Sequence, residues 1–419
     1  MKEMQKKFTD LFFVVLSLPA TAIGFALSVQ IQCLGWILNT QLGYDLHQIG
    51  LVWLAGPLAG ILGQVIVGII SDNTWLWGGR RRPYIIIGGL IGGLMLILLP
   101  NLGAIKNALH LEGTTLLIVA TAIALIFDLS INVSFNPTRT LITDVTPEGE
   151  LRTKGYAWMQ TISGFFGVLA YLIGAFVGNI QLIYMAIFIV PLFTVLPTFF
   201  IEEPKELVAT GENAVTSETN LPEFLKICFA HAFTWVGIQT MFIYTFGFIK
   251  EVVMGYKITQ ELPSQLNDQI GLATGISFAI LNTIGFIFPK FVLEPVSKKI
   301  GKVWTHKLAI LIMAIAYLIT FLFIKDKVGL FVMMAFIGIG WASVVSIIFA
   351  IVSEVVNKAK MGLFMGLFNL AVVIPQIVAS YLGGWINSMH DKSYIFLISS
   401  VCLGISFVIW LFVKDTDKK

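Results

Sequence analysis

The chain has 419 residues, of which 57% are hydrophobic and 12% charged, and its mean hydropathy is +0.87. A soluble domain carries about 25% charged residues, so this composition excludes a water-soluble globular protein. The formal net charge is +3, and no basic patch is interleaved with aromatic residues, which argues against nucleic acid as a partner.

Apolar runs of about 20 residues follow one another along the whole chain, and each is long enough to cross a hydrocarbon core as a helix. The first run is longer than the apolar part of a signal peptide and lacks a cleavage site, so we expect a retained first helix. The runs predict an all-α membrane protein with twelve transmembrane helices. In chain order the predicted spans are 11–39, 48–70, 84–101, 115–143, 154–177, 181–201, 226–251, 270–292, 304–324, 328–352, 362–385 and 393–413.

Basic residues between the spans set the predicted orientation. Most of the 27 Lys and Arg residues lie at the two ends of the chain and in loops on one side, among them Arg80 to Arg82 and the run from Lys298 to Lys307. The positive-inside rule makes that side cytoplasmic, with both termini inside. We therefore expect a multi-pass protein of a bacterial inner (plasma) membrane, in contact with the lipid bilayer.

The first span carries a polar face. Ser28, Gln32 and Asn39 recur at spacings of four and seven, with Trp36 beside them, whereas Gln30 points elsewhere. Hydrogen-bonding groups beside an aromatic ring suit a small polar molecule, so the first four are candidate substrate ligands. Each alone is more often an interhelical hydrogen bond or an interface aromatic, so their value is collective.

A charged loop follows the second span. The segment GIISDNTWLWGGRRRP places one acid, Asp72, before a glycine pair and the basic cluster Arg80, Arg81 and Arg82. An acid and a basic cluster at one membrane face can lock two helices together, which predicts a cytoplasmic gate. The alternative is that the three arginines only anchor the topology.

Charged and amide side chains recur along the fourth span. Asp128, Asn132, Asn136 and Arg139, at spacings of four, four and three, occupy one narrow helical face. A charge at the bilayer centre costs roughly 2.5 to 3.5 kcal/mol, so such residues usually face a cavity or a partner. This stripe is predicted to line a transport path, and a polar seam between helices is the alternative.

Asp128 is the candidate site of a coupling proton. Burial disfavours the charged form of a lone carboxyl, which suits reversible proton binding. A sodium site usually needs several oxygen ligands, and the second span contains no acid. Arg139 is about 16 Å from Asp128 along the helix, too far for a direct ion pair, so we expect it to meet substrate hydroxyls or a different acid.

A hydrophilic stretch from Glu202 to Lys226 follows the sixth span and divides the spans into two sets of six. We predict an N-terminal six-helix bundle at 1–201, a cytoplasmic linker at 202–225 and a C-terminal six-helix bundle at 226–419. Duplicated six-helix halves are the organisation of major facilitator carriers, whose substrate site lies near the bilayer midplane. This is the predicted fold.

A weak internal repeat relates the two halves, with a shift of about 220 residues. Asp72 and Asp144 in the first half are echoed by Glu294 and Glu354 in the second. The recurrence favours a cytoplasmic gate over a topology anchor. We therefore assign Asp72, Asp144, Glu294 and Glu354 to the gate together with the arginine cluster. The positions that correspond to Asp128 and its stripe carry no charge in the second half, so coupling is predicted to be confined to the first half.

The second half adds candidates for the same substrate. Trp235 and Gln239 lie on the seventh span, and Asn369 and Gln376 lie on the eleventh. They offer the same combination of amides with an aromatic ring as the first span.

Other chemistry is not indicated. Cys33, Cys228 and Cys402 lie in or beside apolar spans and are interpreted as small buried hydrophobic residues rather than a disulfide set or a metal site. The sequence has no P-loop, HExxH motif or nucleophile elbow, so we expect neither catalysis nor ATP hydrolysis. No cofactor and no metal are predicted, and the only ion is the coupling proton.

Several segments resemble those of known carriers. They are GPLAGILGQVIVGIISDNTWLWGGRRRP at 56–83, NPTRTLITD in the fourth span, GFALSVQ in the first and HAFTWVGIQTMFIYTFGFIKEV at 231–252. These segments resemble the plant sucrose carriers, which belong with the glycoside-pentoside-hexuronide cation symporters. Lys250 and Glu251 match a basic-acidic pair of that family, whereas Tyr244 and Phe246 stand where it has acids. The resemblance implies sugar symport and a functional role for Arg139.

These features predict a secondary active carrier that takes up a disaccharide, sucrose or maltose, with a proton by alternating access. We expect a neutral sugar, because Arg139 is the only basic residue well inside a predicted span and Asp128 is assigned to the proton. We also expect a monomer. The alternatives are a sodium-coupled or differently selective carrier of the same fold, and a membrane sugar sensor. A sensor should carry a signalling domain or a long tail, which the sequence does not show.

Overall fold

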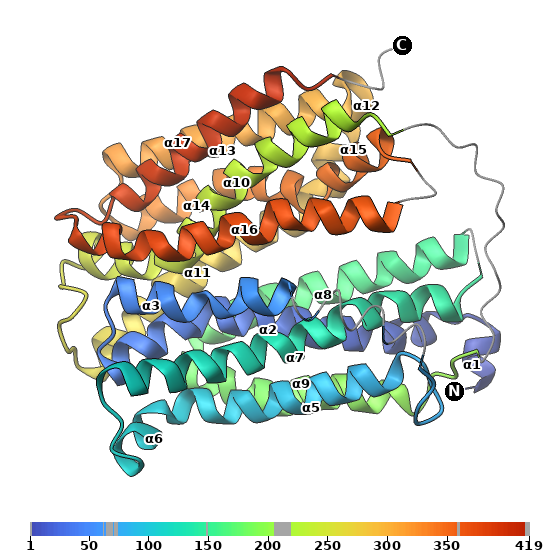
Figure 1. The fold of residues 1–419 in the computed structure, drawn as a ribbon, viewed down its shortest axis with the longest axis horizontal. Helices are drawn as coiled ribbons and strands as arrows, with labels where there is room; N and C mark the ends of the chain where they lie inside the picture. Colours follow the sequence, from blue (N-terminus) through green and yellow to red (C-terminus); the bar gives the residue numbers. More distant parts are fainter. Residues whose placement is uncertain are drawn as a thin grey trace. The chain divides into compact units, whose positions relative to one another are not determined.

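The computed structural model describes residues 2–61, 63, 70, 74–147, 150–204, 219–357 and 361–414, and this part of the chain is built from helices (Figure 1). Eleven of the helices are long and apolar enough to cross a membrane, and a shorter apolar helix covers Leu46–Ile61. The protein is therefore a multi-pass membrane protein. The eleven helices coincide with the predicted spans other than the second, part of which lies outside the described residues.

The helices fall into two compact units. Unit 1 comprises Met1–Leu42 and Val52–Ala209, and unit 2 comprises Gly43–Leu51 and Thr210–Lys419. The short stretch Gly43–Leu51, called segment 43–51 below, thus belongs to unit 2 by its contacts. Much of the predicted linker lies outside the described residues, and its last part is helical, because helix α10 already begins at residue 221.

Unit 1 contains the helices of the first half, with α3 divided between the two units. They are α1 (Lys2–Lys6), α2 (Asp10–Leu42), α3 (Leu46–Trp53), α5 (Arg82–Leu98), η1 (Leu99–Asn101), α6 (Leu102–Ala108), α7 (Gly113–Val145), α8 (Glu150–Phe176) and α9 (Asn179–Thr198). Pro83 lies in the first turn of α5, where its fixed φ suits a helix and its missing N–H is not needed.

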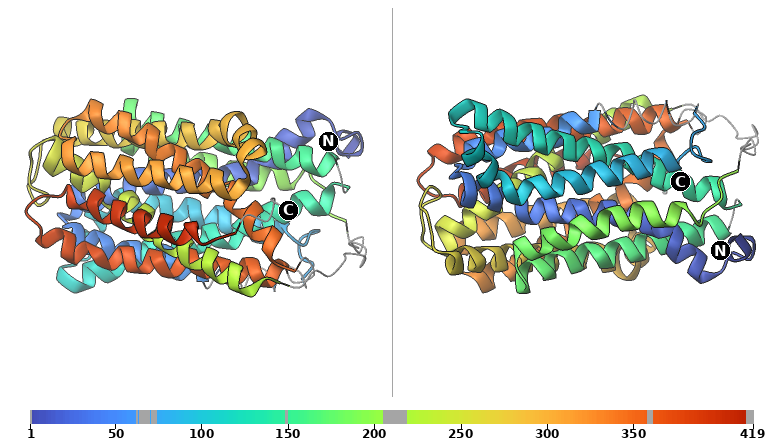
Figure 2. Two further views of the ribbon diagram at one scale, coloured as in Figure 1. Left: turned by 90° about the horizontal axis from the view of Figure 1, so that it is seen from above. Right: turned by 90° about the horizontal axis from the view of Figure 1, so that it is seen from below.

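Helix α5 packs tightly against α7 and α9 because it carries glycine at the contacts. A Cβ atom on Gly88 would overlap the side chain of Ser134, and one on Gly89 would overlap that of Thr194. Small residues let helix backbones approach closely, which is how helices associate where lipid provides no hydrophobic drive. Helix α2 contacts α7, α8 and α9. The helices of this unit run roughly lengthwise alongside one another (Figure 2).

Unit 2 contains the helices of the second half. They are α10 (Leu221–Phe248), the π-helical turn η2 (Ile249–Val253), α11 (Ser264–Phe288), the π-helical turn η3 (Pro289–Leu293), α12 (Glu294–Ile300), α13 (Lys302–Phe323), α14 (Lys327–Val344), α15 (Ile347–Val355), α16 (Met361–Ser388) and α17 (Tyr394–Leu411). Helix α10 packs against α16 and α17, and α13 packs against α14 and α17. A core of buried side chains that includes Phe224, Phe368 and Trp410 joins α10, α13, α15, α16 and α17.

Segment 43–51 is held by small residues of α10 and α16. A Cβ atom on Gly383 would come within 2.6 Å of both the backbone oxygen of Leu46 and the hydroxyl of Tyr244. That hydroxyl donates to the backbone oxygen of Ser380 at 2.7 Å. Tyr244, which stands where the sucrose-carrier resemblance predicts an acid, therefore ties α10 to α16.

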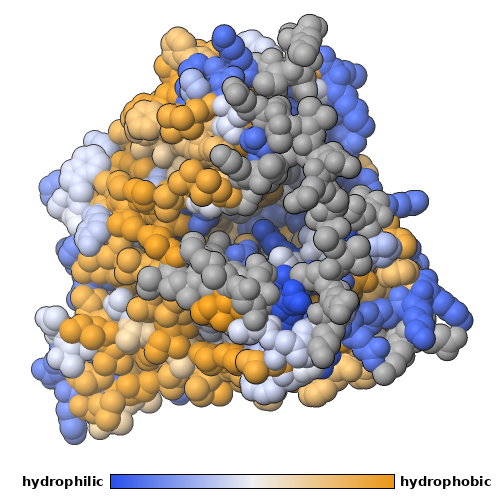
Figure 3. Space-filling view, turned by 45° about the vertical axis from the view of Figure 1, so that its right-hand side comes forward, coloured by the Kyte–Doolittle hydropathy of each residue, from blue (hydrophilic) through white to orange (hydrophobic). Residues whose placement is uncertain are grey.

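The helices present large hydrophobic side chains on the surface. Phe188 exposes 74% of its surface, Phe199 72% and Phe176 71%. Hydrophobic residues cover much of the face shown in Figure 3, and hydrophilic residues gather in smaller areas. Soluble monomers rarely expose apolar patches of this extent, whereas lipid tails cover them without cost.

Candidate functional site

Asp128 lies on α7 inside unit 1, where it is 4% exposed. The side-chain amide of Gln30, on α2, donates to the carboxylate, with Nε2 3.0 Å from each oxygen. The backbone of Gly56 lies close by, since a Cβ atom there would be 3.6 Å from Oδ2. Within the described residues no cation pairs with Asp128. The site is therefore a buried carboxyl whose side-chain partner is a neutral amide.

Three further polar residues follow Asp128 along α7. Nδ2 of Asn132 donates to the backbone oxygen of Asp128 at 2.8 Å, and Asn136 lies one turn further on. The guanidinium of Arg139 lies over the ring of Phe135, 4.1 Å from its centroid, and the residue is exposed. In the described part of the chain no ion pair joins Arg139 to Asp128, so the two charges are not committed to each other.

The polar face predicted on α2 takes part in helix packing. Nε2 of Gln32 donates to Oδ1 of Asn179, at the start of α9, at 2.9 Å. The hydroxyl of Ser28 donates to a backbone oxygen one turn earlier at 3.0 Å. Trp36 and Asn39 are buried, at 8% and 5% exposed. Gln32 thus makes the hydrogen bond of the interhelical alternative, whereas that of Ser28 stays within α2. Their role as substrate ligands stays a prediction.

The candidates of unit 2 lie on α10 and α16. Nε1 of Trp235 donates to Nε2 of His231 at 2.8 Å, one turn earlier on α10. One turn later, Gln239 accepts a hydrogen bond at 3.3 Å from Nε2 of Gln376, on α16. The side chain of Asn369 makes no hydrogen bond with another described residue. The structure thus brings Gln239 and Gln376 together and adds His231, which the sequence analysis did not select.

Two ion pairs occupy corresponding positions in the two units. Nε of Arg81 donates to Oδ2 of Asp144 at 2.9 Å, and the two side chains are 6% and 9% exposed. Lys302 pairs with Glu354, whose side chain is 28% exposed against 33% for the lysine. The basic residues are 221 positions apart (302 − 81) and the acids 210 (354 − 144), against a predicted shift of about 220 residues. Each unit therefore joins a basic residue at the start of one helix to an acid at the end of another.

The other two predicted gate acids are Asp72 and Glu294. Asp72 lies outside the described residues. Glu294 pairs with Lys298 on its own helix at 2.6 Å, and the two side chains are 54% and 72% exposed. An exposed pair at this spacing stabilises a helix only slightly.

The arginine cluster has a partner that sequence reasoning missed. The carboxylate of Glu203 accepts hydrogen bonds from the backbone N–H groups of Arg80 and Arg81 at 2.6 and 2.7 Å, and from that of Arg82 at 2.9 Å. These N–H groups lie at the start of α5, where the helix dipole favours a negative charge. The carboxylate of Glu203 therefore binds the backbone N–H groups of the arginine cluster, while Nε of Arg81 pairs with Asp144.

The family's basic-acidic pair organises the loop after α10. Nζ of Lys250 donates to the backbone oxygens of Ile258 and Gln260, each at 2.9 Å. Oε1 of Glu251 accepts from the backbone N–H of Ile258 at 2.7 Å. The pair thus holds the loop back onto the end of α10.

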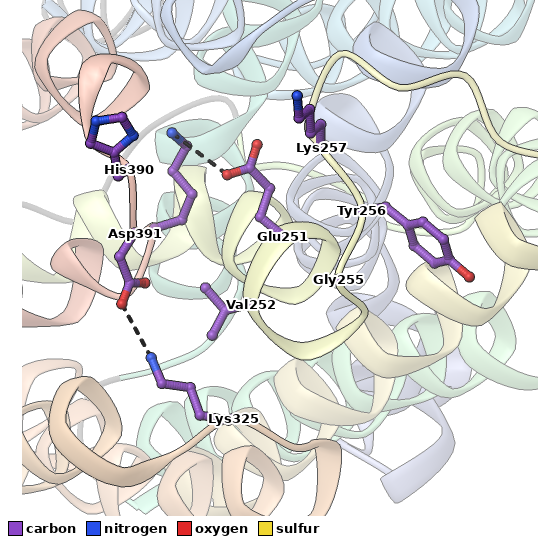
Figure 4. Close-up of a pocket in the computed structure, with 9 residues that line it drawn as sticks. Glu251, Val252, Gly255, Tyr256, Lys257, Lys325, His390 and Asp391 are labelled. Atoms are coloured by element: carbon purple, nitrogen blue, oxygen red, sulfur yellow. Dashed lines mark hydrogen bonds and ion pairs between the residues drawn. The ribbon is translucent and has the colours of Figure 1, made fainter.

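A cavity of about 350 Å³ opens beside this loop (Figure 4). Two ion pairs cross it, with Lys392 Nζ 3.6 Å from Glu251 and Lys325 Nζ 3.3 Å from Asp391. Burial raises the pKa of Asp391, but hydrogen bonds from Ser393 and Lys325 outweigh burial, and the pKa lies below its ordinary value. The charges in the cavity are thus largely matched. Its lining consists of Glu251, Val252, Gly255, Tyr256, Lys257, Lys325, His390, Asp391 and Lys392.

The described residues offer no metal site, since no group of three or more His, Cys, Asp or Glu side chains could hold an ion. Cys33, Cys228 and Cys402 are not bridged to one another.

Known proteins are similar in sequence to this chain. The chain is 25% identical over 454 residues to the sucrose transport protein SUT1 of Oryza sativa subsp. japonica, a match that covers 91% of this chain and 83% of that protein. It is 29% identical over 262 residues to the general alpha-glucoside permease of Schizosaccharomyces pombe, covering 53% of this chain and 47% of the permease. The resemblance to plant sucrose carriers is thereby confirmed.

Solved structures share the fold. The xylose transporter XylE from E. coli, in an inward open conformation, gives a TM-score of 0.72 at 15% identity and covers 97% of both chains. The nucleoside transporter NupG gives 0.68 at 13% identity, over 96% of this chain and 97% of NupG. All of these relatives are transporters rather than enzymes. The family model of the Major Facilitator Superfamily matches residues 16–380, and the chain therefore belongs to the Major Facilitator Superfamily.

Proposed function

We propose that this protein is a secondary active carrier that takes up a neutral disaccharide, sucrose or an α-glucoside such as maltose, together with a proton. The names of the sucrose and alpha-glucoside relatives support the substrate class. The single observation that carries the coupling proposal is the environment of Asp128, which is buried and whose side-chain partner is the amide of Gln30. Ionisable side chains held in this way inside a membrane commonly serve as proton relays.

The candidate ligands suit a neutral, polyhydroxylated molecule. Amides such as Gln239 and Gln376 offer both donors and acceptors, and Arg139 adds one exposed cation. An organic anion would call for more than one cation on the path, and an organic cation for an acid besides Asp128. The proposed ligand is therefore a sugar rather than an ion.

The finer architecture forms part of the proposal. We propose twelve spans in two six-helix bundles, with Leu46–Ile61 as the beginning of the second, and both termini on the cytoplasmic side of a bacterial inner membrane. The ion pairs Arg81–Asp144 and Lys302–Glu354 would then lie on the cytoplasmic face and open during alternating access. The carrier is proposed to act as a monomer.

Uptake by purified protein in proteoliposomes tests the function. One charge that crosses 100 mV gains roughly 2.3 kcal/mol, which supports about fiftyfold accumulation of the sugar. We expect radiolabelled sucrose or maltose to accumulate when an inward proton gradient and an interior-negative potential are imposed. In a parallel set of experiments an inward sodium gradient replaces the proton gradient. Organic anions and amines serve as control substrates.

The variant Asp128→Asn separates coupling from binding. It should still bind the sugar and exchange it across the membrane, because the amide keeps the shape of the carboxyl, but it should not accumulate sugar. Accumulation of sugar driven by a sodium gradient alone would show that the coupling ion is sodium and not the proton. Failure of every sugar to bind, with binding of an organic ion instead, would refute the sugar carrier.

A further inference from the structure

His231 is a buried titratable residue with no role in the proposed proton path. It lies on α10 and is 1% exposed, and its ring stacks on that of Phe368, on α16, with centroids 4.6 Å apart and planes at 19°. Its Nε2 accepts the indole N–H of Trp235 at 2.8 Å. A hydrogen bond and a stacked ring thus hold the imidazole in one orientation.

The hydrogen bond from Trp235 determines which tautomer is present. A nitrogen that accepts a hydrogen bond is unprotonated, so a neutral His231 carries its proton on Nδ1. Nδ1 is buried and has no hydrogen-bond partner among the described residues. A core that needed only a flat ring against Phe368 would be better served by phenylalanine, because burying an unpartnered polar atom is unfavourable. The presence of a histidine at this position is therefore best explained by the nitrogen that accepts the hydrogen bond from Trp235.

The indole that His231 holds is part of an aromatic cluster. The ring of Trp235 meets that of Trp341, on α14, edge to face at 6.1 Å and 81°, and Phe242 meets Trp341 in the same way at 5.3 Å and 78°. Trp341 fits against α11 because Gly285 has no side chain, and a Cβ atom there would lie 2.6 Å from its ring. The rings of three residues from two helices therefore constrain one another.

This cluster lies beside hydrogen-bonding groups. Gln239 follows Trp235 by one turn of α10 and is joined to Gln376. Neither Trp235 nor Trp341 is fully buried in unit 2. A sugar ring has C–H groups that pack on an aromatic face and hydroxyl groups that amides can bind, so this combination suits a sugar.

We propose that His231 is a positioning residue for sugar binding, because it holds the indole of Trp235 so that Trp235 and Trp341 form an aromatic surface for a sugar ring. This inference rests on the proposed function. In this proposal His231 does not touch the sugar. His231 affects the affinity for the sugar only through Trp235, and this dependence can be tested.

Two substitutions of His231 distinguish positioning from packing. His231→Phe keeps a flat ring against Phe368 but removes the acceptor for the indole. His231→Gln places an amide oxygen within reach of the same N–H and keeps the acceptor. Loss of one orienting hydrogen bond should weaken sugar binding by roughly five- to tenfold in the Phe variant. The Gln variant should stay within about twofold of the wild type. The matched control is His306→Phe, at the other buried histidine of unit 2, which bonds Ser343.

A double-mutant cycle with Trp235→Phe tests whether His231 acts through the indole. Sugar dissociation constants are measured by calorimetry on the full-length protein in detergent. If the proposal is right, His231→Phe weakens binding in the wild-type background and has no further effect in Trp235→Phe, because the two residues act as a unit.

The outcomes separate this inference from the proposed function. If the wild type binds no sugar of the panel, the proposed function fails and takes this inference with it. If the wild type binds a sugar, two results refute only the positioning role. One is that His231→Phe does not weaken sugar binding, and the other is that it weakens binding equally in the wild-type and Trp235→Phe backgrounds. A loss in His306→Phe equal to that in His231→Phe would also refute it, since both would then reflect general damage to unit 2.

Discussion

Gln30 controls the charge state of Asp128 if the proton proposal is right. Replacing it by Gln30→Met keeps the length of the side chain but removes the amide that donates to both carboxylate oxygens at 3.0 Å. A hydrogen bond to a charged group contributes roughly 1.5 to 3 kcal/mol. The amide stabilises the ionised carboxyl more than the protonated one, so its removal favours the protonated form.

The size of the effect follows from this energy. One pH unit corresponds to about 1.36 kcal/mol, so the pH of half-maximal uptake should move upward by about one to two units in Gln30→Met. The assay is initial sugar uptake into proteoliposomes as a function of external pH, at a fixed potential. Gln32→Met is the matched control, because Gln32 bonds Asn179 instead of Asp128. The rate of uptake can change, since Gln32 is a candidate substrate ligand, but the pH of half-maximal uptake should stay the same. A Gln30→Met profile that overlays the wild type would refute the assignment of Asp128 as the proton site.

Two further predictions concern stability, measured by thermal unfolding in detergent. Arg81→Ala leaves Asp144 buried without its cation and should cost roughly 3 to 5 kcal/mol, whereas Lys302→Ala, in the more exposed pair, should cost less than about 1 kcal/mol. Equal losses of stability in the two variants would show that the difference in burial does not determine how much each ion pair contributes. Gly89→Ala should cost roughly 1 to 3 kcal/mol because its Cβ atom overlaps α9, while Gly404→Ala, which meets open space, should be neutral. A tolerated Gly89→Ala would mean that α5 and α9 are less tightly packed than described.

The fold was accessible from the sequence because a membrane imposes a simple rule on it. A span must be apolar over its whole length, and that signal is local. Eleven predicted spans coincide with helices, and even short features such as the start of α5 at Pro83 follow from local preference. The internal repeat stays a prediction, and it agrees with the finding that Arg81 and Lys302 each pair with an acid in their own unit.

The site was harder to predict because its contacts join distant parts of the chain. Helical spacing separated Gln30 from the face of Gln32, but one helix alone does not reveal which neighbour each face meets. The partner of Gln30 is 98 residues away. Glu203 was read as part of a hydrophilic linker, although its carboxylate binds the start of α5, 121 residues earlier. Both contacts depend on how helices pack within unit 1, which no local pattern encodes.

The two units are not consecutive stretches of chain, because segment 43–51 belongs to unit 2. A cut in the stretch after Glu203 would release a C-terminal fragment without this segment, leaving the surface around Gly383 uncovered. We expect that fragment to be degraded when it is expressed alone and to survive when the N-terminal fragment is supplied. During synthesis, the residues that complete unit 2 emerge long before the rest of that unit, so correct insertion of the early helices is a condition for finishing the late ones.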